Sequence, residues 1–198
     1  IPLLKLIGTM YLAIGIFLVI LVIGAAVVTK VNLVGFMKVI KEPMVLAFTT
    51  SASEAALPIA MEKLERIGIP KHIVSFVLPL GYTFNLDGST LYSAVAVIFL
   101  GQVYGVPLPL GLQIVILLTL MISTKGIAGV PGAALIILAG TATAFGIPVE
   151  GVAMLLGIDR VLDMARTMCN VTGNCIAGLV VARWEHEISA EDLNSYIE

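Results

Sequence analysis

Charged residues are scarce in this sequence, and their scarcity excludes an ordinary soluble domain. Asp, Glu, Lys and Arg together make up 12% of the 198 residues, whereas about 25% is usual in soluble domains. The stretches 6–29, 88–124 and 126–149 contain no charged residue at all. Each is longer than the roughly 20 residues that an apolar helix needs to cross a bilayer. The sequence therefore predicts an all-α membrane protein embedded in a lipid bilayer.

Cysteine, histidine and basic tracts are also nearly missing. Cys169 and Cys175 are the only cysteines, and we expect both to be small packing residues. The only histidines, His72 and His186, lie outside the apolar stretches, and no Cys/His spacing typical of a metal site is present. The net charge of -2 comes without a basic cluster, which argues against a nucleic-acid partner. We therefore expect no enzyme activity and no cofactor.

The apolar segments are interrupted in a repeated way. Residues 6–29 read as one transmembrane helix, whereas 36–62 is broken in its middle by small and polar residues. Because half of that segment is too short to span a bilayer, we predict a re-entrant hairpin there. Residues 70–104 read as a transmembrane helix broken at 85–89, where Asn, Asp and Gly disfavour helix. A second re-entrant hairpin is predicted at 109–142 and a last transmembrane helix at 152–182, a repeat that is typical of secondary transporters.

The basic residues predict the orientation in the membrane. If both hairpins re-enter, the basic residues of the loops all fall on one side; they are Lys30, Lys38, Lys41, Lys63, Arg66, Lys71 and Arg183. The positive-inside rule makes that side cytoplasmic. The first hairpin then enters from the cytoplasm and the second from outside, and residues 184–198 form a polar cytoplasmic tail.

The last predicted helix carries a cluster of charges in its middle. Four of the seven charged residues between 73 and 182 are Asp159, Arg160, Asp163 and Arg166, and each costs roughly 2.5 to 3.5 kcal/mol at the centre of a membrane helix. A helical stripe about 80° wide holds most of the polar side chains, namely Asp159, Asp163, Arg166, Asn170 and Asn174. Intramembrane charges of this kind mark functional sites.

This stripe suits a zwitterion that carries an additional carboxylate. Asp163 matches an ammonium group, the planar fork of Arg166 matches a side-chain carboxylate, and Asn170 can donate to an α-carboxylate. Two alternatives remain at this point. The acids and bases could neutralise one another and staple helices together, although buried ion pairs stabilise poorly. The stripe could also line an ion channel, although its mixed signs fit a zwitterion better than a stream of one ion.

Four motifs resemble the glutamate/aspartate transporter family, the dicarboxylate/amino acid:cation symporters. They are Thr50-Ser51-Ala52-Ser53-Glu54 followed by Leu57-Pro58, Asn85-Leu86-Asp87-Gly88-Ser89, Gly126-Ile127-Ala128-Gly129-Val130-Pro131-Gly132, and the stretch 159–174. The resemblance runs from about residue 11 to the end and is nearest to the proton-coupled bacterial members. It implies that 1–183 is part of a transport domain that moves, elevator-like, against a scaffold in a homotrimer. The scaffold helices that come first in the family are expected to be missing here, and a bacterial inner membrane is the expected location.

The resemblance also assigns residues to the substrate and to the coupling ion. The substrate positions are Ser53, Ser89, Val130 through its backbone, Asp163, Arg166, Thr167 and Asn170, with Asp159 and Arg160 as supporting charges. The cation positions are Gly81, Thr83, Asn85, Asp87, Asn170 and Asn174.

Two departures from the family concern the ion. Sodium-coupled members have Asp where this chain has Asn174 and Thr where it has Ile127, and Lys125 adds a positive charge nearby. Fewer oxygen ligands weaken the binding of a hard cation. We therefore predict proton coupling, with residual sodium dependence, and name Glu54, Asp87 and Asp163 as candidate proton carriers. Sodium-coupled glutamate/aspartate transport and symport of C4-dicarboxylates remain the alternatives.

Overall fold

The structure, a computed structural model, describes residues 2–125 and 133–197, and helices are the regular secondary structure of these residues. The helices are α1 (Pro2–Thr29), α2 (Leu33–Val39), α3 (Lys41–Thr50), α4 (Ser53–Arg66), α5 (Lys71–Phe84), α6 (Asp87–Val103), α7 (Leu110–Ser123), α8 (Ala133–Ala144), α9 (Glu150–Trp184) and α10 (Ala190–Ile197). The prediction of an all-α protein is confirmed for these residues.

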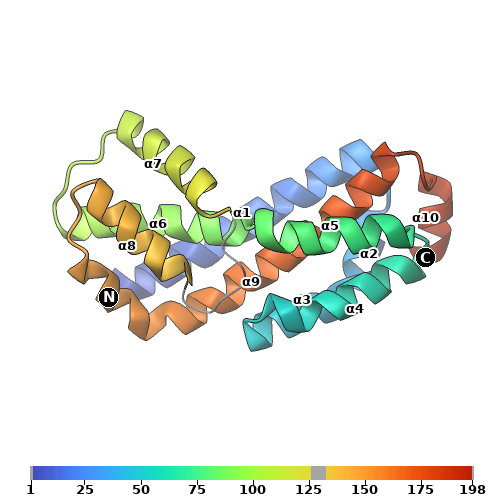
Figure 1. The fold of residues 1–198 in the computed structure, drawn as a ribbon, viewed down its shortest axis with the longest axis horizontal. Helices are drawn as coiled ribbons and strands as arrows, with labels where there is room; N and C mark the ends of the chain where they lie inside the picture. The colour runs from blue at the N-terminus through green and yellow to red at the C-terminus, as the bar shows by residue number, and fades with distance from the viewer. Residues whose placement is uncertain (1, 126–132, 198) are drawn as a thin grey trace.

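Two long helices, α1 and α9, run through the length of the molecule (Figure 1). Helix α9 has 35 residues and packs against α1, α3, α5 and α6. One hydrophobic core joins the C-terminal half of α9 to α2, α3, α4 and α5, with Phe36 and Leu64 completely buried. A second core joins its N-terminal half to α6, α7 and α8, with Leu100 and Leu138 completely buried. The middle of α9 therefore lies between two separately packed halves.

The predicted first hairpin is present as the antiparallel pair α3 and α4. Helix α3 ends at Ser51, which adopts left-handed backbone angles (φ 53, ψ 32), and Ala52 is extended (φ -130, ψ 105). The Ala52 N–H donates to the Thr50 hydroxyl at 3.2 Å, so the chain reverses within two residues. Helix α3 is only 10 residues long, about 15 Å at 1.5 Å per residue. That is half the thickness of a bilayer core, so re-entry from one side stays our prediction.

The predicted break in the next membrane segment is also present. Helices α5 and α6 are separated by Asn85 (φ -102, ψ 69) and Leu86 (φ -102, ψ 56), whose backbone angles are not helical. The Asn85 N–H donates to the Gly81 carbonyl at 2.7 Å, which closes the last turn of α5. The two half-helices end midway along the molecule (Figure 1).

The second predicted hairpin corresponds to α7 and α8, which pack against each other and against α6. Its tip, 126–132, lies outside the described residues, and so do Ile127 and Val130. The last described turn of α7 is fixed by Thr124, which is completely buried and shares a hydrogen bond of 2.7 Å with the Thr90 hydroxyl. This bond ties the end of α7 to the first turn of α6.

The polar tail that the sequence predicts after residue 183 contains a docked helix, α10. The Arg183 side chain donates to the carbonyls of Thr29, at 3.2 Å, and Ile188. The Asn194 carboxamide oxygen accepts the Asn32 N–H at 2.8 Å, and Leu193 is completely buried. The tail is thus part of the folded unit and lies at the end of the molecule opposite the N-terminus (Figure 1).

In the part of the chain that the structure describes, two stretches are long and apolar enough to cross a membrane, Pro2–Thr29 and Lys71–Val103. Half of the residues of α1 are exposed, and its exposed side chains include Leu12, Ile16, Ile20 and Val27. Soluble proteins rarely expose continuous apolar surfaces of this size. Lipid or another membrane helix is the expected cover.

The contact between α6 and α9 gives a first prediction, because it depends on Gly88. A Cβ atom added at Gly88 would lie 2.4 Å from the Arg166 backbone carbonyl, so Gly88→Ala should push the two helices apart. We expect it to destabilise the protein by about 1 to 3 kcal/mol, measured as a lower thermal unfolding midpoint in detergent. Gly157→Ala on α9 is the matched control, since no atom lies within 4 Å of its added Cβ. Equal midpoints for the two variants would contradict this contact.

Candidate functional site

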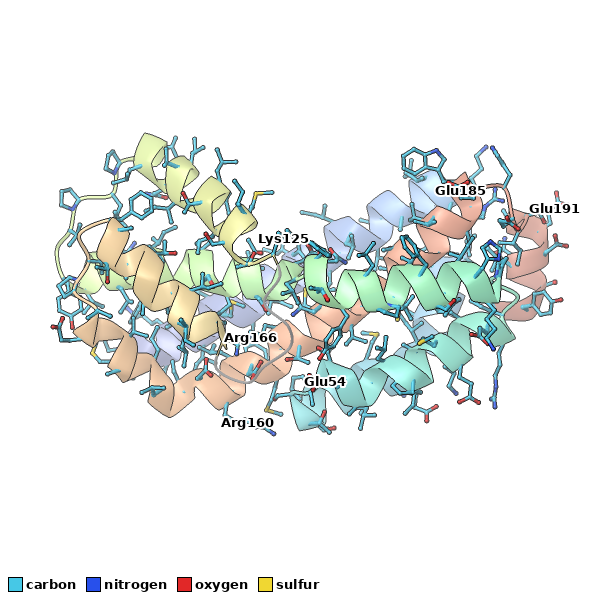
Figure 2. The ribbon with its side chains drawn as sticks, viewed as in Figure 1. Glu54, Lys125, Arg160, Arg166, Glu185 and Glu191 are labelled. Carbon is cyan, nitrogen blue, oxygen red and sulfur yellow. The ribbon has the colours of Figure 1, made fainter. Side chains whose placement is uncertain are left out.

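The middle of α9 meets three chain interruptions. The turn between α3 and α4, the break between α5 and α6, and the end of α7 all approach it (Figure 1). Figure 2 shows Arg166 in this central region, with Glu54 of the first hairpin on one side and Lys125 at the end of α7 on the other. Helix ends leave backbone N–H and C=O groups without helical partners. Polar backbone and charged side chains therefore gather at one place inside an apolar molecule.

Arg166 is the centre of the charged cluster and is only 4% exposed. Its Nε donates to Asp163 Oδ1 at 2.7 Å, and its Nη1 lies 3.4 Å from Asp159 Oδ1. The guanidinium carbon lies 4.8 Å from the centre of the Tyr92 ring, within the range of a cation–π contact. Both acids lie on α9 itself, one and two turns before the arginine, so the helix supplies its own counter-charges.

The cluster leaves hydrogen-bonding capacity for another group. Asp163 Oδ1 also accepts the Thr167 hydroxyl at 3.0 Å. Among the described residues, the two acids take one N–H each from Arg166. The other N–H groups lie in the plane of the guanidinium, an arrangement that can bind a planar carboxylate through two parallel hydrogen bonds. The site can therefore bind an anionic group at Arg166 and, next to it, a cationic group at Asp163.

Asn170 attaches the first turn of α6 to α9. Its Oδ1 accepts the Gly88 N–H at 2.8 Å, and its Nδ2 donates to the Ser89 hydroxyl at 3.1 Å. The sequence predicts that Asn170 donates to a ligand carboxylate. In this structure its amide is bonded on both sides to α6, so it positions Ser89 beside the charged cluster.

A second polar cluster surrounds the break between α5 and α6. One terminal atom of the Asn85 amide lies 2.8 and 3.0 Å from the Asp87 carboxylate oxygens, and the other lies 3.0 Å from Asn174 Oδ1. With the Asn85 nitrogen facing Asp87, the amide donates to that carboxylate, and its oxygen accepts from Asn174 once the Asn174 amide nitrogen faces it. Asp87 is the carboxylate of this cluster, whose other groups are neutral amides.

Two glycines make room for this second cluster. A Cβ at Gly81 would lie 2.5 Å from Asn174 Oδ1, and one at Gly173 would lie 3.0 Å from Asp87 Oδ2. Oxygen atoms suit a hard cation such as sodium, but high affinity needs several charged ligands. No group of three acidic, His or Cys residues that could hold a metal ion occurs in the described ranges. The groups present fit a weakly held monovalent cation or a proton.

The remaining predicted residues lie around these clusters. Ser53 begins α4 and lines a small cavity with Tyr82 and Asn174, and Thr83 lies in the last turn of α5. Glu54 is exposed at the tip of the first hairpin. Arg160 is exposed and points away from the cluster (Figure 2). The structure thus brings Asp159 to Arg166 but leaves Arg160 outside.

Two features of the site were not predicted from the sequence, namely the tyrosine that packs against the arginine and the hydroxyl pair at the end of α7. Tyr92 follows Gly88 by four residues, so both lie on the face of α6 that meets α9. That spacing could have revealed Tyr92, because a close glycine contact marks the buried face. No comparable local signal joins Thr90 to Thr124, since 34 residues separate them.

The sequence is similar to one family of symporters and to individual transporters over nearly all of its length. Residues 1–184 match the sodium:dicarboxylate symporter family. All of the chain aligns, at 47% identity, with the "Proton/sodium-glutamate symport protein" of Geobacillus stearothermophilus, over 47% of that protein's length. The "Proton/glutamate-aspartate symporter" of Escherichia coli K12 is 45% identical over 98% of the chain and 45% of its own length. The "C4-dicarboxylate transport protein" of Cupriavidus pinatubonensis is 44% identical over the whole chain and 46% of its own length. The chain therefore spans about half the length of these curated relatives.

Because the Arg166 cluster is buried, removing a charge from it should destabilise the protein more than removing a charge from an exposed ion pair. Asp163→Asn removes the negative charge of a buried ion pair and should destabilise the protein by on the order of 3 kcal/mol. Glu62→Gln removes the negative charge that pairs with the exposed Arg66, at 2.5 Å, and should cost less than about 1 kcal/mol. Thermal unfolding of both variants in the same detergent measures the difference. If Asp163→Asn were as stable as Glu62→Gln, the guanidinium would not depend on this carboxylate.

Proposed function

Because the chain belongs to the sodium:dicarboxylate symporter family, we propose that the protein carrying it is a secondary transporter that takes up L-glutamate and L-aspartate with a coupling cation. The observation that supports this most directly is the buried Arg166 between two carboxylates and an aromatic ring. The names of two relatives, a proton/sodium-glutamate and a proton/glutamate-aspartate symporter, agree with it.

The site binds the substrate by exchange of partners around Arg166. The side-chain carboxylate of the ligand takes the free fork of Arg166, and the ligand ammonium takes the Asp163 carboxylate. Each buried charge then keeps an opposite charge beside it, which avoids the cost of leaving one unpaired. Thr167, Ser89 and Asn170 lie next to this position and supply hydroxyl and amide groups. Ser53 of the first hairpin completes the site, and Val130, the predicted contributor from the second hairpin, lies outside the described residues.

Transport follows the elevator arrangement that the family resemblance implies. The two hairpins re-enter the membrane from opposite sides. The end of the molecule that carries the loop lysines and arginines, together with α10, lies on the cytoplasmic face of a bacterial inner membrane. The helices described here carry the substrate and move against a scaffold supplied by the rest of the chain in a homotrimer. The exposed apolar face of α1 is a surface that such a neighbour or lipid would cover.

The coupling ion is a proton, with a residual contribution from sodium. The cluster at the break holds one carboxylate, Asp87, beside Asn85 and Asn174. Lys125 is near enough to Asp87 to interact with it electrostatically, which opposes a second cation there. Glu54, Asp87 and Asp163 are the candidate proton carriers.

Symport of C4-dicarboxylates is the second candidate, because one relative carries that name. The position of Asp163 favours amino acids. A dicarboxylate has no ammonium group to pair with this acid, which would then repel the second carboxylate of the ligand.

Substrate uptake tests the role of Arg166. In proteoliposomes without sodium and with an imposed proton gradient, the full-length protein should accumulate glutamate. Arg166→Ala should weaken glutamate binding on the order of 100-fold, because it removes two charge-assisted hydrogen bonds. Arg160→Ala, which removes an exposed arginine from the same helix, should retain uptake. Unchanged glutamate affinity in Arg166→Ala would sink the proposal.

The sodium response tests the second cluster. Asn174→Asp adds a carboxylate beside Asn85, so it should lower the sodium concentration that half-saturates glutamate binding, on the order of tenfold. Asn32→Asp is the matched control, because Asn32 caps α2 through its side-chain oxygen and lies far from the cluster in the chain. Calorimetric titration of glutamate at several sodium concentrations measures both. An unaltered sodium response, with glutamate binding intact, would contradict the assignment.

A further inference from the structure

A groove of about 540 Å³ lies along the first hairpin and the end of α2, away from the charged cluster. Lysines line one end of it: Lys38 from the last turn of α2, Lys41 from the start of α3 and Lys63 from α4. Helices α3 and α4, which form most of its walls, run side by side (Figure 1). None of these groups has a part in the proposed substrate or cation site.

The basic end of the groove carries an excess of positive charge. Lys63 Nζ lies 2.7 Å from Glu42 Oε2, so this lysine is neutralised by a neighbour. Lys38 and Lys41 are exposed, and neither forms an ion pair with any residue in the described ranges. The groove therefore offers two uncompensated ammonium groups at one end.

The other end of the groove is apolar. Val45, Leu46 and Ile59 form its walls, and Val45 is 50% exposed. From Lys41 to Thr49, the most distant lining residue on α3, the chain advances eight residues, about 12 Å along the helix. The groove thus has a charged end and an apolar trough that runs towards the hairpin tip.

We propose that this groove binds one anionic phospholipid, with its phosphate at Lys38 and Lys41 and an acyl chain along Val45, Leu46 and Ile59. Charge and shape both favour this occupant. Basic pockets on the cytoplasmic side of membrane proteins attract anionic head groups, and these lysines lie on the side that the positive-inside rule makes cytoplasmic. A free phosphate would leave the apolar trough exposed to water, whereas a lipid fills both ends.

Native mass spectrometry of the full-length protein tests this binding directly. The detergent-purified protein is mixed with phosphatidylglycerol or phosphatidylcholine of the same chain length, and glycerol phosphate serves as the soluble head-group probe. We expect one phosphatidylglycerol to be retained in preference to phosphatidylcholine, and no retention of glycerol phosphate. Since each lysine contributes about fivefold to anionic binding, Lys38→Gln/Lys41→Gln should reduce that preference by about 25-fold.

Two further variants separate the two ends of the groove. Lys30→Gln/Lys71→Gln removes two exposed lysines that lie on the same predicted cytoplasmic side but do not line the groove. This variant should keep the preference for phosphatidylglycerol. Val45→Ser shortens the apolar wall and should weaken retention of both lipids while the head-group preference persists. Unfolding midpoints verify that each variant is folded. The proposal would be overturned if the unaltered protein retained both lipids equally, as it would if another part of the chain covered the groove. It would also be overturned if Lys38→Gln/Lys41→Gln kept the full preference for phosphatidylglycerol.

Discussion

The Arg166 guanidinium is buried in the middle of the longest helix, and the cost of removing that charge from water constrains everything packed around it. Two carboxylates on the same helix and the face of Tyr92 surround it. A purely structural pair would be a weak reason for such an arrangement, because buried ion pairs stabilise little more than apolar residues of the same volume. Within the described ranges, neither acid takes the remaining N–H groups of the guanidinium, and the proposed ligand, which carries both charges, would pair with them and with the acid.

The interrupted helices follow from the same constraint. A continuous α5–α6 helix would bring apolar side chains to α9, whereas the break at Asn85 and Leu86 brings a helix end, an amide and a carboxylate. Glycines at the contact points allow this: Gly81, Gly88 and Gly173 each admit an atom that a methyl group would displace. The short turn at Ser51 likewise ends α3 midway along the molecule (Figure 1). The helix break, the short turn and the glycine contacts thus place polar groups at one central position.

Much of this arrangement was predictable from local pattern, and the remainder depends on contacts between distant segments. The break after Phe84 followed from the low helix propensity of Asn, Asp and Gly, and the polar stripe of α9 followed from helical periodicity. The docking of α10 was not predictable, because it depends on Arg183 reaching Thr29 and Asn194 reaching Asn32 across the fold. The same holds for Asn170, whose amide bonds to Gly88 and Ser89 from 82 and 81 residues away. Arg160 lies next to Asp159 in the chain, yet the helical turn directs it outward.

On binding an acidic amino acid, Arg166 and Asp163 are proposed to exchange their mutual contact for contacts with the ligand. A cryo-electron microscopy map of the full-length protein with bound L-aspartate tests this exchange most directly. We expect the ligand side-chain carboxylate about 3 Å from the Arg166 nitrogens and the ligand ammonium at a similar distance from Asp163. A ligand bound elsewhere, with Arg166 still held by Asp163 and Asp159, would contradict it.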